Sequence, residues 1–108
     1  KQEVGYFSVL KVMITQGPPN VIFTLKGELD LTTSRILRKE VEKIELDKVA
    51  SITFSLNELK FIDSTGIGQL IGYYRSFAKQ HTSVYIDNKN ADIEEVLELI
   101  GVREIMET

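Results

Sequence analysis

The sequence contains no cysteine, only two prolines and a single histidine among its 108 residues. Without cysteine, a disulfide framework, a thiolate metal site and a thiol nucleophile are all excluded. The histidine, His81, follows a predicted helix, whose C-terminal end favours a solvated, partly positive imidazole. The acidic residues are scattered and offer no ligand cluster to accompany it. We therefore expect neither a metal site nor a cofactor.

Long apolar runs and blocks of like charge are also missing. No stretch approaches the roughly 20 apolar residues that span a bilayer, and Lys1 to Tyr6 lack the apolar core of a signal peptide. Thirteen basic and sixteen acidic residues give a net charge of -3, spread along the chain. Such a surface does not attract a phosphate backbone. These features predict a cytoplasmic protein without a membrane span and without a nucleic-acid partner.

The composition that remains is that of one folded domain. Apolar residues make up 43% of the chain and charged residues 27%, which is enough apolar surface to form a core. The length suits one domain and leaves no room for a separate cofactor domain. We expect residues 1–108 to form a single unit.

Four segments have the pattern of β-strands. Tyr6 to Thr15 and Val21 to Lys26 are rich in aromatic and β-branched residues and flank the turn sequence Gly17-Pro18-Pro19-Asn20, which predicts a hairpin. Apolar and polar residues alternate from Ser51 to Leu56, which predicts a third strand. Ser83 to Asp87 predicts a short fourth strand.

Helical periodicity fills the intervals between these strands. It predicts helices over Thr32–Leu46 and Ser64–Gln80, and a third helix capped by Asp92 and ended by Gly101. Arg103 to Met106 is expected to add a final edge strand. The order β-β-α-β-α-β-α-(β) predicts an α/β domain with a mixed four- to five-stranded sheet, an opening antiparallel hairpin and helices packed on the sheet.

Catalytic patterns are not found. Ser64 lacks the Gly-x-Ser-x-Gly elbow, and His81 would lie about 25 Å away at the other end of the same helix, which excludes a serine hydrolase. Gly66, Gly68 and Gly72 do not have the spacing of a dinucleotide-binding turn. The sequence therefore predicts a protein that is not an enzyme.

The most informative segment is Phe61-Ile62-Asp63-Ser64-Thr65-Gly66-Ile67-Gly68. Glycine costs about 1 kcal/mol relative to alanine inside a helix, so helix stability did not select these glycines. One interpretation is a polar N-cap followed by glycines that allow close helix–sheet packing. The other is an exposed surface that a second protein approaches closely, with the Ser64 hydroxyl at its centre.

This segment and an earlier one, Gly27-Glu28-Leu29-Asp30-Leu31, resemble motifs of the STAS domain family. The second motif is the more specific, because bacterial anti-sigma factor antagonists share Asp-Ser-(Ser/Thr/Ala)-Gly-(Leu/Ile)-Gly there. The predicted order of elements also agrees with this family over nearly the whole chain. Members usually carry a further C-terminal helix, which is not expected before Thr108.

The resemblance implies a partner-switching role. In that family, an anti-sigma factor that is itself a serine kinase phosphorylates the serine that corresponds to Ser64. The unphosphorylated antagonist captures the kinase and frees a sigma factor, and a serine phosphatase restores the phosphorylated form. The loop Gly27–Asp30 is expected beside Ser64. The implied docking surface comprises Gly27, Glu28, Asp30, Asp63, Ser64, Thr65, Gly66 and Gly68.

Two other classes of function remain open at this point. STAS domains also occur as modules of anion transporters, stress-signalling scaffolds and lipid-transport complexes, and those need no phosphoserine at this position. A small enzyme or nucleotide-binding protein would instead bind a ligand tightly as an isolated chain. The intact Asp63-Ser64-Thr65-Gly66 sequence favours the phosphorylation switch over both.

Overall fold

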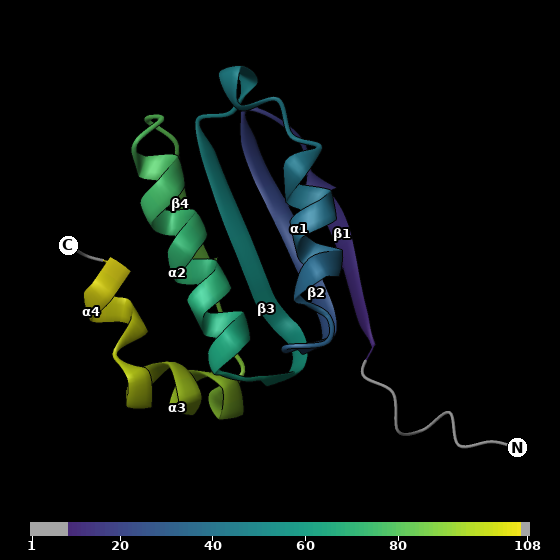
Figure 1. Ribbon diagram of the computed structural model, residues 1–108, viewed down its shortest axis with the longest axis vertical. Coiled ribbons are helices and arrows are strands. Elements are labelled where there is room, and N and C mark those ends of the chain that lie inside the picture. The colour runs from purple at the N-terminus through teal and green to yellow at the C-terminus, as the bar shows by residue number, and fades with distance from the viewer. Residues whose placement is uncertain (1–8, 107–108) are drawn as a thin grey trace, which may run out of the picture.

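A four-stranded mixed sheet forms the centre of the protein in the computed structural model, which describes residues 9–106 (Figure 1). The strands lie in the order β1-β2-β3-β4. β1 is antiparallel to β2, whereas the pairs β2–β3 and β3–β4 are parallel, so the expected mixed sheet is confirmed. The predicted start of the first strand, residues 6–8, lies outside the described residues. The strands are β1 (Leu10–Gln16), β2 (Asn20–Leu29), β3 (Ser51–Ile62) and β4 (Ser83–Asp87).

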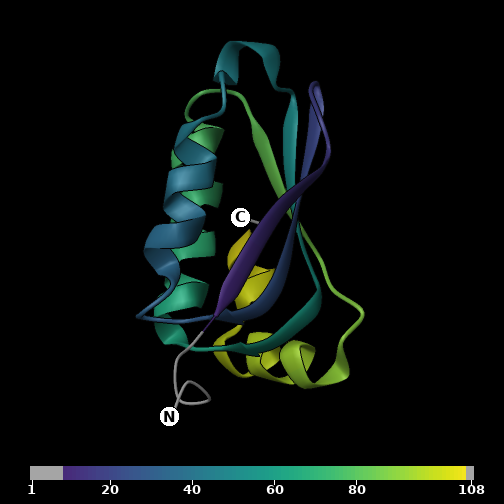
Figure 2. The same ribbon diagram turned by 90° about the vertical axis from the view of Figure 1, so that its right-hand side faces the viewer.

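Helices connect the parallel strands, as crossovers between such strands require. Figure 2 shows α1 and α2 on the same face of the sheet, and α3 across the end at which α2 begins. No helix in residues 9–106 has the length and apolar character needed to cross a membrane. The helical elements are α1 (Ser34–Glu42), the 3-10 turn η2 (Leu46–Lys48), α2 (Ser64–Ala78), α3 (Ala91–Ile100) and α4 (Val102–Met106).

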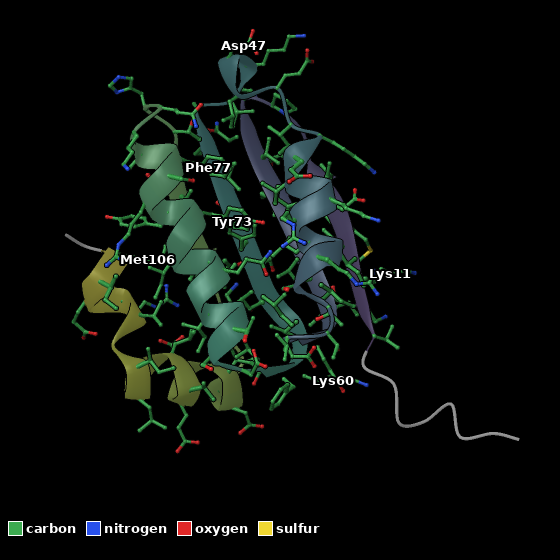
Figure 3. The ribbon with its side chains drawn as sticks, viewed as in Figure 1. Lys11, Asp47, Lys60, Tyr73, Phe77 and Met106 are labelled. Carbon is green, nitrogen blue, oxygen red and sulfur yellow. The ribbon has the colours of Figure 1, made fainter. Side chains whose placement is uncertain are left out.

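The core lies between this sheet face and the helices. Phe23 and Phe54, on neighbouring strands, are fully buried with their rings stacked 5.7 Å apart between centroids. The stack continues into α2, where Phe54 packs on Tyr73 at 5.7 Å and Tyr73 on Phe77 at 5.6 Å. Figure 3 shows Tyr73 and Phe77 beneath α2. Stacked aromatic rings contribute beyond the apolar area that they bury. They fix α2, and with it Ser64, against the sheet.

The C-terminal segment differs from the sequence prediction. Arg103 to Met106 belongs to the short helix α4 rather than to an edge strand. Gly101, at φ 77°, ends α3, and the chain turns at once so that Val102 is fully buried. The Arg103 guanidinium then donates to the Ile86 carbonyl and to both carboxylate oxygens of Glu94, at 2.9 to 3.3 Å. These contacts hold α4 against β4 and α3.

The cap of α3 also differs. Asn90, not Asp92, is the N-cap residue, and its side-chain oxygen accepts hydrogen bonds from the N–H groups of Asp92 and Ile93. The Asn90 amide also donates to the Leu59 carbonyl at 2.8 Å, which ties the start of α3 to β3. Asn and Asp cap helices about equally well. The hydrogen bond from the Asn90 amide to the Leu59 carbonyl favours asparagine over aspartate at position 90, because an ionised carboxylate cannot donate it.

Candidate functional site

Ser64 is the first residue of α2 and is exposed to solvent. It follows β3, whose twelve residues extend to Ile62 at the edge of the core. The buried Ile62 on one side and the buried Ile67 on the other fix the backbone of this turn. The hydroxyl therefore stands on a rigid connection between strand and helix.

Asp63 holds the turn together from within. One carboxylate oxygen accepts a hydrogen bond from the Gly66 N–H at 2.9 Å and so caps α2. The other accepts from the Leu31 N–H at 3.2 Å, in the loop that follows β2. An ionised carboxylate makes such hydrogen bonds stronger than a neutral acceptor would. Asp63 thus joins the start of α2 to the loop before α1.

The loop before α1 is shaped by Asp30 and Thr33. Asp30 retains only 8% of its accessible surface, and one of its oxygens accepts hydrogen bonds from the Thr32 and Thr33 backbone N–H groups and from the Thr32 hydroxyl. The buried Thr33 hydroxyl bonds the Glu28 carbonyl at 2.8 Å. The sequence predicts Asp30 at the docking surface, but the structure places its carboxylate inside the loop. Its role there is to fix the path of Leu31 and Thr32.

The glycines that follow Ser64 are not equivalent. A Cβ on the buried Gly66 would lie 2.7 Å from the Leu29 carbonyl oxygen and 2.9 Å from the Leu29 side chain, so close helix–sheet packing requires glycine there. Gly68 and Gly72 are exposed, and a Cβ on either would meet nothing within 4 Å. Packing explains Gly66, whereas no contact within residues 9–106 explains Gly68 and Gly72.

Gly27 and Glu28 lie in β2 and not in a loop, which corrects their predicted location. Gly27 has φ 107°, and a Cβ on it would clash with the Val9 carbonyl. The ladder bulges between Gly27 and Glu28, where Glu28 pairs with Phe61. Only Leu29 separates Glu28 from Asp30. Glu28 is therefore near the Ser64 end of the sheet, while Gly27 has a conformational role.

Two apolar side chains at this end were not identified from the sequence as site residues. Leu31 is 73% exposed in the loop tied to Asp63, and Phe61 is 49% exposed three residues before Ser64. Two large apolar side chains exposed at the same end of the sheet offer contact area to a partner protein. Both residues belong to the motifs quoted above, so the sequence pointed to this region. Their exposure could not be predicted, because it depends on where β2 and β3 end.

A hydrogen-bonded contact joins α1 to α2 beside the site. The Gln69 amide donates to the Ser34 carbonyl and to the Tyr73 hydroxyl, both at 2.9 Å. Burial raises the pKa of Tyr73 above its ordinary value, against the opposing effect of this hydrogen bond. The contact keeps the first turn of α1 in register with α2.

Asp63 is the carboxylate next to Ser64, whereas the histidine lies far from it. His81 lies beyond the C-terminal end of α2, exposed and at φ 63°, and so at the far end of that helix from Ser64. Across residues 9–106 there is no group of three or more His, Cys, Asp or Glu side chains arranged to hold a metal ion. The arrangement presents a hydroxyl and a small, partly apolar surface, which suits recognition by another protein.

Comparison with known proteins supports this description. The model of the STAS domain family matches residues 11–108. An anti-sigma F factor antagonist from Paenibacillus polymyxa is 31% identical over 87 residues, covering 80% of this chain and 74% of that protein. An anti-sigma-B factor antagonist from Bacillus subtilis is 21% identical and covers 91% of this chain and 89% of its own.

A solved structure agrees in fold. The crystal structure of an anti-sigma factor antagonist from Mycobacterium paratuberculosis superimposes with a TM-score of 0.78 at 17% identity. The match covers 89% of this chain and 81% of that one. The mixed sheet and its helices are therefore an arrangement that this chain shares with an antagonist of low sequence identity.

Proposed function

The chain belongs to the STAS domain family, and we propose on that basis that it is an anti-sigma factor antagonist whose binding to a kinase-type anti-sigma factor is switched off by phosphorylation of Ser64. The observation that carries the proposal is the position of Ser64. It is an exposed hydroxyl at the start of α2, directly after the capping carboxylate of Asp63, in the motif that resembles the phosphorylated segment of such antagonists. The relatives of this chain are named as antagonists of anti-sigma factors.

The docking surface proposed for the kinase centres on Ser64, Thr65 and Gly68. All three are exposed, and Gly68 leaves the backbone of α2 uncovered. Leu31 and Phe61 supply the apolar contacts around them. Hydrogen bonds accepted by Asp63 and Asp30 fix the backbone beneath this surface, and the close packing of Gly66 on Leu29 holds α2 in place.

Phosphorylation changes the charge of this surface. A phosphoserine adds a charge of about -1.5 to -2 at pH 7, next to the Asp63 carboxylate. A kinase surface that fits a small neutral hydroxyl would then have to desolvate a dianion, which is costly unless a cation pairs with it. Inside the chain, the N-terminal end of α2 tolerates negative charge. The proposed switch acts on the interface and leaves the fold unchanged.

In this proposal the chain supplies no catalysis of its own. The anti-sigma factor is the kinase, and a separate serine phosphatase removes the phosphate. Because these partners regulate a sigma factor, the proposed site of action is the cytoplasm.

The proposal is tested by incubating the protein with ATP and the serine-kinase anti-sigma factor from the same genome. Mass spectrometry of the digested product should place one phosphate on Ser64. Ser64→Ala should abolish the modification and keep the circular dichroism spectrum of the wild type, because the exposed hydroxyl takes no part in the core.

Thr65→Ala and Ser76→Ala are the matched controls, since both residues are exposed hydroxyls on α2. Ser76→Ala should be labelled as fully as the wild type, because Ser76 lies outside the proposed docking surface. Thr65→Ala should still carry its phosphate on Ser64, even where the loss of a docking-surface hydroxyl slows the reaction. Phosphate on Thr65 in the wild type, or labelling that survives Ser64→Ala, would show that the proposed switch residue is wrong.

A further inference from the structure

Three lysines line one cleft on the sheet face opposite to α1 and α2. Lys11 on β1 lies directly across the antiparallel ladder from Lys26 on β2, and Lys60 on β3 completes the cluster. Val9 and Gly27 form the rest of the lining, and the cleft has a volume of about 310 Å³. Figure 3 shows Lys11 and Lys60 on the same side of the molecule, toward the end at which β1 begins.

None of the ion pairs found within residues 9–106 involves these three lysines. Glu58 is the register partner of Lys26 on β3 and is exposed, yet no ion pair joins the two. Lys43, Lys48 and Arg103 do pair with carboxylates elsewhere. Among residues 9–106, the three ammonium groups therefore face one cleft with no carboxylate within ion-pair distance.

This arrangement costs stability. Side chains directly opposite each other in an antiparallel ladder are close neighbours, and like charges at such positions destabilise the pairing. A sheet face that is exposed to solvent can carry charges of both signs, and the chain as a whole is acidic, with a net charge of -3. Lysine on the edge strand β1 discourages pairing with another chain, but Lys26 and Lys60 lie on the inner strands β2 and β3, where that reason does not apply.

We propose that this cleft binds a ligand that carries multiply charged phosphate. Lysine recognises phosphate as a compact point charge, and three ammonium groups match an anion with two or more charges. The cleft volume is large enough for a phosphoryl or diphosphoryl group. The phosphate can belong to a soluble molecule or to a lipid headgroup. The proposal does not depend on the phosphorylation switch at Ser64, because the three lysines lie on strands and Ser64 is the first residue of α2.

The test is a calorimetric titration of the protein with inorganic pyrophosphate at low ionic strength. The wild type should bind saturably, and affinity should fall as salt is raised because the attraction is screened. The double variant Lys26→Gln/Lys60→Gln should bind about tenfold more weakly or worse, since it loses two of the three charges. Lys39→Gln/Lys79→Gln, which removes two exposed lysines outside the cleft, should bind like the wild type.

Two further arms identify the source of the phosphate and guard against a folding defect. Vesicles of phosphatidylglycerol, compared with phosphatidylcholine, show whether a lipid headgroup binds with the same lysine dependence. Amide chemical shifts of Lys26 and Gly27 in the wild type should move with pyrophosphate, and this measurement requires no variant. The proposal is overturned if pyrophosphate does not bind the wild type, if the double variant binds equally well, or if an oligoglutamate peptide binds more tightly than pyrophosphate.

Discussion

Between Asp63 and Gly68, some residues stabilise the fold and others lie on the surface. Asp63 and Gly66 are committed to the fold, one through two hydrogen bonds and the other through close packing on Leu29. Ser64, Thr65 and Gly68 remain on the surface. Of the two interpretations of the glycines that the sequence left open, close packing applies to Gly66, whereas a docking role for Gly68 stays a proposal.

This division predicts opposite effects for two similar substitutions. Gly66→Ala should lower the free energy of unfolding by about 1–3 kcal/mol, because the new methyl group would overlap the Leu29 backbone. Gly68→Ala should raise it by up to about 1 kcal/mol, because the position is open and alanine is the better helix former. Urea denaturation of the two variants and the wild type measures both changes. Equal changes for the two variants would contradict the division.

At the scale of elements, periodicity located the strands and the helices α1, α2 and α3 because their apolar faces meet one core. The predicted helix Thr32–Leu46 was too long, since α1 covers only Ser34–Glu42 and Leu46 begins the 3-10 turn η2. The pattern failed where a segment is short. Arg103 to Met106 spans less than two helical turns, too few for a period of 2 to be distinguished from 3.6, and tertiary contacts of Arg103 decide its structure. The choice of Asn90 as a cap likewise depends on Leu59, which is distant in sequence.

The packing of α2 on the sheet predicts a large cost for cavity formation. Leu70 is fully buried, and Leu70→Ala should lower the free energy of unfolding by about 2–5 kcal/mol. Its neighbour Ile71 is only partly buried, so Ile71→Ala is the matched control and should cost less. Thermal and urea unfolding give both values. A loss below about 0.5 kcal/mol for Leu70→Ala would mean that α2 does not pack as described.

The contact between α3 and α4 predicts a pH dependence of stability. Hydrogen bonds from Arg103, and then from Asn88, lower the pKa of Glu94 in the folded protein. Its ionised form is therefore favoured by folding, and its contribution is complete above the unfolded pKa, about 4.3. That contribution is lost as the pH falls through the lower folded pKa.

Glu94→Gln should consequently be less stable than the wild type at pH 6, and the difference should shrink as the pH falls from about 4.3 downward. Urea midpoints measured from pH 6 to pH 3 follow this change. Glu98→Gln, at an exposed position on the same helix, should give a curve parallel to that of the wild type. A constant difference between Glu94→Gln and the wild type at every pH would exclude the Glu94 carboxylate as its source.

On the scale of the whole molecule, the fold brings two distant motifs to one end of the sheet. β2 and β3 are parallel and end together, with Leu29 paired to Ile62, so the segments after them are neighbours. The two motifs predict that these segments lie side by side and that the Ser64 hydroxyl is exposed. The burial of Asp30 is not predicted, because it depends on contacts with Thr33 in the assembled structure. Which of the glycines packs against the sheet is also left open by the sequence, because that depends on Leu29.

The central claim is that the charge state of Ser64 controls binding to a kinase-type anti-sigma factor. Calorimetric titration of that kinase with unphosphorylated protein, protein phosphorylated on Ser64, and Ser64→Ala tests it most directly. Unphosphorylated protein and Ser64→Ala should bind with similar affinity, because both present a small neutral surface. The phosphorylated form should bind at least about tenfold more weakly, a difference of about 1.4 kcal/mol. Equal affinity of the kinase for the phosphorylated and unphosphorylated forms would contradict the account.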